Sequence, residues 1–139
     1  MWKSLLLCIV ALGAQAEDGL PRSTAPATAA VYFISPADGE SVKGAVIVRF
    51  GLRGMGVAPA GINMLGTGHH HLLIDVEALP SLDKPLPKDA QHLHFGAGQT
   101  ETTLTLAAGK HTLQLVLGDQ LHIPHQPPVL SQKITITVE

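Results

Sequence analysis

The feature that most constrains this fold is a period of two in the apolar side chains, repeated in short segments. Near the middle of the chain, Val46, Val48 and Phe50 occupy alternate positions, and Ile134 and Ile136 repeat the pattern near the C-terminus. This alternation is typical of β-strands that bury one face. We find no segment with a helical period over ten or more residues. The chain is therefore expected to be all-β.

Glycine and proline separate these segments, since the chain contains 14 glycines and 10 prolines. We expect about seven short strands, joined by turns, in an antiparallel immunoglobulin-like β-sandwich. A glycine-rich region, residues 54–68, is either a functional loop or a long crossover between strands. The expected strands cover residues 31–34, 41–52, 69–76, 92–95, 100–106, 111–117 and 131–138.

The N-terminus has the features of a secretory signal peptide over residues 1–16. A lysine at position 3 precedes a short apolar run, and Ala14-Gln15-Ala16 forms a small-x-small cleavage site. We expect cleavage before Glu17, a flexible linker over residues 17–29, and one domain over residues 30–139. The mature protein is then expected in the bacterial periplasm.

The composition argues against several classes of function. Cleavage removes Cys8, the only cysteine, so the mature chain has neither a disulfide nor a thiolate site. A net charge of −2 without a basic block argues against nucleic acid as a partner. No second apolar stretch is long enough to cross a bilayer. The sequence lacks a G-x-S-x-G elbow and a phosphate-binding loop, so we expect no enzyme.

Histidine is the residue type that offers chemistry. Seven of the eight histidines fall into three clusters, and His111 stands alone. His70 shares its strand face with Leu72 and Ile74, which predicts a core histidine, and His111 is expected to cap a strand. The clustered histidines that remain as candidate metal ligands are His69, His71, His92, His94, His122 and His125.

Two of the clusters predict a four-histidine site across neighbouring strands. Residues two apart in a strand share a face, so His69 and His71 point together, as do His92 and His94. If the two strands pair, these imidazoles can converge on one copper or zinc ion, for which nitrogen ligands are suited. Leu72 predicts that the opposite face of its strand meets the core.

The third cluster lies in a proline-rich loop, residues 118–128. Pro124 restricts the backbone between His122 and His125, and we expect the loop to contribute one or two ligands or to cover the site. Asp119 is a candidate to orient one imidazole by accepting its second N–H.

An alternative interpretation needs no metal. Histidines on strands also form structural hydrogen-bond networks, and Met55 and Met64 are more typical of loop packing than of ligation. The protein would then be a periplasmic structural or protein-binding module, with another periplasmic protein as its partner, since fold does not determine function. Metal titration distinguishes the two hypotheses.

Several long motifs resemble one bacterial family. They include V-Y-F-I-S-P-A-D-G, G-M-G-V-A-P-A-G, G-H-H-H-L-L-I-D, H-L-H-F-G-A-G-Q-T, G-K-H-T-L-Q-L-V-L-G-D and H-I-P-H-Q-P-P. Together they resemble the secreted family catalogued as domain of unknown function 4399, over residues 31–138. The resemblance implies a small exported bacterial protein. It supplies neither an activity nor site residues, so the site has to be argued from this chain.

Overall fold

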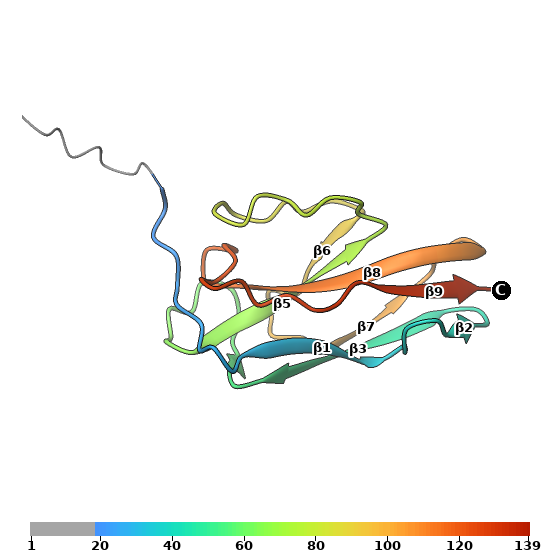
Figure 1. Ribbon diagram of the computed structural model, residues 1–139, viewed down its shortest axis with the longest axis horizontal. Helices are drawn as coiled ribbons and strands as arrows, with labels where there is room; N and C mark the ends of the chain where they lie inside the picture. Colours follow the sequence, from blue (N-terminus) through green and yellow to red (C-terminus); the bar gives the residue numbers. More distant parts are fainter. Residues whose placement is uncertain (1–18) are drawn as a thin grey trace, which may run out of the picture.

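Two β-sheets face each other in the computed structural model, which describes residues 19–139 (Figure 1). The predicted signal peptide lies outside the described residues. The smaller sheet has the order β1-β3-β7, built from β1 (Ala30–Ser35), β3 (Val46–Arg53) and β7 (Glu101–Leu104). The larger sheet has the order β2-β9-β8-β5-β4, with β6 paired to β5; its strands are β2 (Ser41–Val42), β9 (Ile134–Val138), β8 (Gly109–Gly118), β5 (Thr67–Ile74), β4 (Gly56–Val57) and β6 (His92–His94).

The predicted all-β sandwich is confirmed, with two differences in the strands. The expected strand over residues 41–52 is divided, because Gly44 has a φ of 75° and turns the chain from β2 in one sheet to β3 in the other. Within the glycine-rich region, Gly56–Val57 forms a short strand parallel to β5. The β2–β9 pair is also parallel, and the remaining strand pairs are antiparallel.

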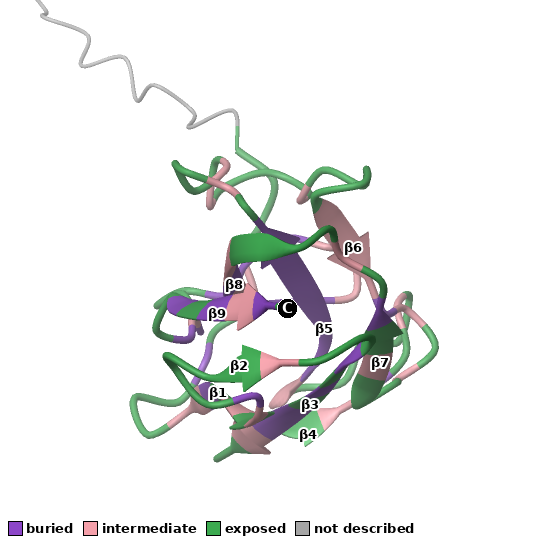
Figure 2. Ribbon diagram, turned by 90° about the vertical axis from the view of Figure 1, so that its right-hand side faces the viewer, coloured by how far each residue is buried: buried purple, intermediate pink, exposed green. Residues whose placement is uncertain are grey.

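The core lies between the sheets and follows the alternation of the sequence (Figure 2). Val46, Val48 and Phe50 of β3 are buried, while Ile47 between them is 49% exposed. Leu113, Leu115 and Leu117 of β8 and Ile134, Ile136 and Val138 of β9 complete the facing layer. Burial of these apolar side chains supplies the main driving force for folding.

The segment before β1 contacts the domain, whereas we expected a flexible linker there. Ala25 is buried in the core, and its N–H donates to the carbonyl of Gln126 at 3.1 Å. The guanidinium of Arg22 donates to the carbonyls of Pro124 and His125. Proline and alanine content predicted the lack of regular structure, but the long-range bonds to residues 124–126 were not visible in the sequence.

Strand β5 is buried on both faces, from Gly68 to Ile74. Its inner face packs against the smaller sheet, and Figure 1 shows the connection between β5 and β6 passing over the outer side of the larger sheet. An outer face buried in this way is unusual for an antiparallel sheet, in which one side commonly meets solvent. Within residues 19–139 the structure has no helix that could span a membrane.

Candidate metal centre

The two histidine-bearing strands pair with each other, which is the condition on which the predicted four-histidine site depended. β5 and β6 are antiparallel neighbours, and His71 lies directly opposite His94. The ring centroids of these two histidines are 5.2 Å apart. His69, two residues before His71 on the same face, lies 4.6 Å from His71 and 5.0 Å from His94. Three imidazoles from two strands therefore meet on the outer face of the sheet.

A fourth imidazole comes from the loop between β8 and β9. The ring centroid of His122 lies 4.6 Å from that of His94, 5.0 Å from that of His69 and 6.0 Å from that of His71. We call His69, His71, His94 and His122 the four-histidine cluster. The predicted square contained His92 in place of His122, and the predicted role of the loop included one or two ligands.

The backbone at His122 is held in a conformation that few residues adopt. Its φ is 66°, in the left-handed region, and strain of this kind is concentrated at functional sites. Asp119 is buried and supports the turn, because its Oδ1 accepts the N–H groups of Leu121 and Ile123 at 2.9 and 3.0 Å. Its Oδ2 accepts the hydroxyl of Ser23 at 2.9 Å. We had expected Asp119 to accept an imidazole N–H. Its carboxylate instead accepts these backbone and hydroxyl groups and so positions the backbone around His122.

Two glycines leave room for the rings of the cluster. A Cβ on Gly118 would lie 2.6 Å from Cε1 of His71, and a Cβ on Gly96 would lie 2.6 Å from Nε2 of His94. A Cβ atom does not approach the carbon or nitrogen of a ring this closely. Both positions therefore require glycine, because the imidazoles approach them closely. The motif H-L-H-F-G did not by itself reveal this requirement.

Three imidazoles of the cluster, those of His69, His71 and His94, have a lowered pKa, which favours their neutral form. Burial, together with the nearby His122 and His94, lowers the pKa of His69 to about 4. Burial and the other three rings lower the pKa of His71 to about 3. The pKa of His94 is also lowered, mainly by burial and then by His122 and Lys88. Neutral imidazole is the form that offers a nitrogen lone pair to a metal.

Few of these ring nitrogens have hydrogen-bond partners. Seven of the eight buried, unpartnered side-chain atoms found within the described residues are histidine nitrogens. Four of the seven belong to His69, His71 and His94. A buried polar group without a partner costs about 1–3 kcal/mol, so a concentration of them calls for a ligand such as an ion.

The spacing of the four rings fits a tetrahedral metal ion. Nitrogen ligands lie about 2.0–2.1 Å from zinc, which places the centroids of four tetrahedrally arranged imidazoles roughly 5 Å apart. The six centroid distances in the cluster run from 4.6 to 6.0 Å. Nitrogen atoms of His69, His71 and His94 all lie within 4.8 Å of one another, so these three residues could hold a metal ion.

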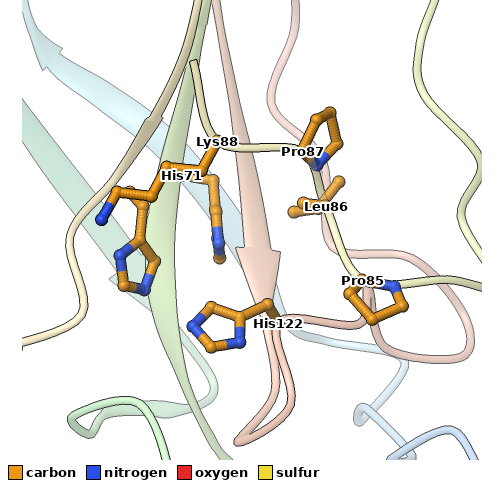
Figure 3. Close-up of a pocket in the computed structure, with 7 residues that line it drawn as sticks. His71, Pro85, Leu86, Pro87, Lys88 and His122 are labelled. Atoms are coloured by element: carbon orange, nitrogen blue, oxygen red, sulfur yellow. The ribbon is translucent and has the colours of Figure 1, made fainter.

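A cavity of about 270 Å³ adjoins the cluster (Figure 3). It is lined by three cluster histidines and by the segment before β6: His71, His94, His122 and residues 85–88. The N–H of Leu86 donates to the carbonyl of His122 at 2.9 Å, which ties this proline-rich segment to the histidine loop. Prolines restrict the backbone of the segment, so it forms a stiff cover over the cluster.

The remaining histidines lie outside the cluster. Nδ1 of His92 is 2.8 Å from Oδ1 of Asp89, and this hydrogen bond lowers the pKa of Asp89. His125 is buried with its Nε2 on the carbonyl of Thr67 at 3.1 Å. The alternation of residues along a strand could not show that His92 and His125 lie outside the cluster. Hydrogen bonds to Asp89 and to the carbonyl of Thr67 determine where these two rings point.

His70 and His111 have the structural roles that their positions predicted. His70 is fully buried against Phe50, with ring centroids 5.0 Å apart, and burial lowers its pKa to about 4. His111 contacts Asp75 through Nδ1 and the carbonyl of Ala107 through Nε2, both at 2.7 Å. Met55 is partly buried against the core, consistent with packing.

Sequence comparison places the cluster within a known family. The family described as "Domain of unknown function (DUF4399)" matches residues 48–139, a span that includes all four cluster histidines. This chain belongs to the DUF4399 family. The match confirms the resemblance seen in the motifs. The DUF4399 chain matches no curated protein.

One comparison of structures also gives a match. A structure titled "Structures of Clostridium thermocellum CbhA fibronectin(III)-like modules" is similar to this DUF4399 protein, with a TM-score of 0.36 and 12% sequence identity. The match covers 78% of this chain and 92% of the other.

Proposed function

We propose that this DUF4399 protein binds one divalent transition-metal ion, Cu(II) or Zn(II), through His69, His71, His94 and His122. The observation that carries the proposal is the convergence of four imidazoles at centroid distances of 4.6–6.0 Å. Centroids at this spacing match those of four imidazoles around a tetrahedral ion, and nitrogens of His69, His71 and His94 lie within 4.8 Å of one another. The protein acts by binding the ion, and we assign no catalytic residue.

Metal binding accounts for the cluster better than a structural network does. A network of histidines stabilises a fold through hydrogen bonds between ring nitrogens and their neighbours. The described residues supply such bonds at His111, where both ring nitrogens have partners. In contrast, both nitrogens of His69, Nδ1 of His71 and Nε2 of His94 are buried without partners. A bound ion would give one nitrogen of each of these rings the partner that it lacks.

The donor set supports copper or zinc among the divalent metals. Imidazole suits both ions, and a nitrogen site generally binds Cu(II) more tightly than Zn(II). The tetrahedral arrangement is the one that structural Zn(II) sites adopt. Residues 17–139 contain no cysteine, so a thiolate site of the kind that selects Cu(I) is not available.

The proposed location is the periplasm, where the protein would handle metal outside the cytoplasm. The signal-peptide pattern of residues 1–16 supports export, and the lack of cysteine after it suits a domain that folds without disulfides. Mass spectrometry of the protein from a periplasmic fraction tests this. We expect an N-terminus at Glu17, and a mature species that retains Met1 would contradict export with cleavage.

Calorimetric titration of the purified protein with Cu(II) and Zn(II) tests the function. We expect one ion per chain, bound with a Kd in the low micromolar range or tighter, which corresponds to about 8 kcal/mol or more. His111→Ala is the control, since that histidine lies outside the cluster, and it should bind as the wild type does. Absence of saturable binding of either ion would contradict the proposal.

A further inference from the structure

His92 has the geometry of a metal ligand but lies outside the four-histidine cluster. Its Nδ1 contacts Oδ1 of Asp89 at 2.8 Å. A carboxylate in this position accepts the Nδ1–H, which fixes the tautomer and leaves the lone pair on Nε2. Nε2 of His92 makes no hydrogen bond within residues 19–139. The ring is therefore oriented and prepared to bind a cation, without a partner for that nitrogen.

The loop also fixes the carboxylate that orients His92. Oδ1 of Asp89 accepts the N–H groups of Gln91 and His92 at 2.9 and 3.0 Å, in addition to the imidazole. These bonds close a tight turn just before β6. Asp89 and His92 are thus a preformed pair rather than two side chains that meet by chance on a surface.

His92 is accessible to solvent, whereas two members of the cluster are buried. The side chain of His92 is 17% exposed. His94 and His122 are also half-buried, while His69 and His71 are buried. Asp89 and His92 line an open pocket of about 420 Å³, and His94 forms part of its wall. His94 also lines the cavity of about 270 Å³ that His71 and His122 share. His94 therefore lies between the exposed histidine and the rest of the cluster.

We propose that His92, oriented by Asp89, is the capture ligand that takes up the metal ion from solvent and passes it to the cluster through His94. The inference rests on the proposed function. Strand positions two apart are separated by about 6.5–7 Å, so Nε2 of His92 and a nitrogen of His94 can bind one ion together at about 2.0 Å each. The ion then moves by exchange of one ligand at a time.

In each step one ligand enters the coordination sphere of the ion as another leaves. A hydrated ion first loses one water to Nε2 of His92 and a second water to His94. Nitrogens of two of the other three cluster histidines next replace the remaining waters. The nitrogen of the last one replaces His92, which leaves the ion. Stepwise exchange spreads the loss of hydration over several steps, whereas direct passage under the cover of residues 85–88 would remove most waters at once.

Stopped-flow measurement of metal uptake tests this assignment, with Zn(II) or Cu(II) presented in a weak chromophoric chelator. For His92→Ala we expect the uptake rate constant to fall by about tenfold, within the range over which single changes alter association rates. The release rate constant should fall by a similar factor, because a capture ligand speeds both directions. The equilibrium affinity should stay within about twofold of the wild type.

His111→Ala is the matched control, because His111 is also paired with an aspartate but has its Nε2 bonded to the carbonyl of Ala107. It should leave both rate constants unchanged. An uptake rate equal to the wild type in His92→Ala would overturn the inference. So would a lower affinity caused by faster release, which would make His92 a ligand of the final site. Failure of the wild type to bind either ion would instead overturn the proposed function.

Discussion

The two faces of β5 carry equally buried histidines in very different surroundings. His70, on the inner face, is fully buried between the sheets against Phe50. His69 and His71, on the outer face, are 0% and 3% exposed beneath loops. All three have a lowered pKa, with burial as the largest cause. The two faces differ in their neighbouring side chains. The outer rings contact His94 and His122, while the inner ring packs against Phe50.

This comparison shows that burial and a lowered pKa do not by themselves define a site. A buried imidazole that packs against apolar side chains, as His70 does against Phe50, has no neighbouring group that could be a second metal ligand. The outer face brings four imidazoles together with centroids 4.6–6.0 Å apart, and three of them, His69, His71 and His94, could hold a metal ion. The predictions below test the difference between the faces.

The largest expected effect is on metal affinity. Replacing both outer histidines, His69→Ala with His71→Ala, should weaken Zn(II) or Cu(II) binding by at least about a thousandfold. Loss of an outer-shell partner alone costs about 10–100-fold, and here two direct ligands are lost. His70→Ala, on the inner face, should bind within about threefold of the wild type. Competition titration against a chelator of known affinity measures both.

A second double variant checks that the loss of affinity does not result from misfolding of β5. His94→Ala with His122→Ala removes the two ligands that do not belong to β5, and it should also weaken binding by about a thousandfold. Circular dichroism confirms the fold of each variant. Equal losses in the His70→Ala variant and the outer-face variants would remove the distinction between the two faces.

The sequence predicted the strand-borne part of this site for a physical reason. Strand parity is strict, so the alternation around Leu72 sorted His70 from His69 and His71, and the H-x-H spacing placed His94 on the matching strand. The choice between His92 and His122 depends on loops. It follows from the Asp89 hydrogen bond and from the left-handed backbone at His122, neither of which has a periodic signature.

The second prediction concerns pH, which affects both faces of β5. The pKa values of His69 and His70 are lowered to about 4 and that of His71 to about 3, from 6.5. Between pH 6.5 and about 4 the unfolded chain therefore binds protons that the folded chain does not. The free energy of unfolding should be greatest above pH 6.5 and should decline by a few kcal/mol as the pH falls through this window.

Urea denaturation of the metal-free protein at several pH values measures this decline. His111 acts in the opposite direction, because its bond to Asp75 raises its pKa, and its contribution is lost as the pH rises through that raised value. A urea midpoint that stays constant from pH 6.5 down to about 4 would contradict neutral burial of the β5 histidines.

A smaller effect is expected from filling the space beside His94. Gly96→Ala would place a Cβ 2.6 Å from Nε2 of that ring, so the imidazole has to move. We expect metal affinity to fall about tenfold, the lower end of the loss seen when a ligand is displaced from its support. Gly56→Ala is the control, since its Cβ would meet only Cγ2 of Thr67, at 3.7 Å. An unchanged affinity in Gly96→Ala would mean that His94 is not held where the cluster needs it.

The smallest effect is on stability, from the inner face alone. His70→Leu replaces a buried ring with two unpartnered nitrogens by an apolar side chain. We expect the free energy of unfolding to increase by about 1 kcal/mol, because no hydrogen bond is lost and an uncompensated polar group is removed. His111→Leu, which loses two hydrogen bonds, should decrease it by about the same amount. Thermal denaturation of the two variants measures both changes. Destabilisation by His70→Leu would contradict the prediction.

The most direct test of the account is X-ray absorption spectroscopy of the zinc-loaded protein, which counts the imidazoles on the ion. We predict four nitrogen ligands at about 2.0 Å, all with imidazole scattering, and a first shell that loses imidazole in the variant with His69→Ala and His71→Ala. The same spectrum should be retained in His70→Ala. A first shell of mainly water or carboxylate oxygen in the wild type, with two imidazoles or fewer, would contradict the four-histidine centre.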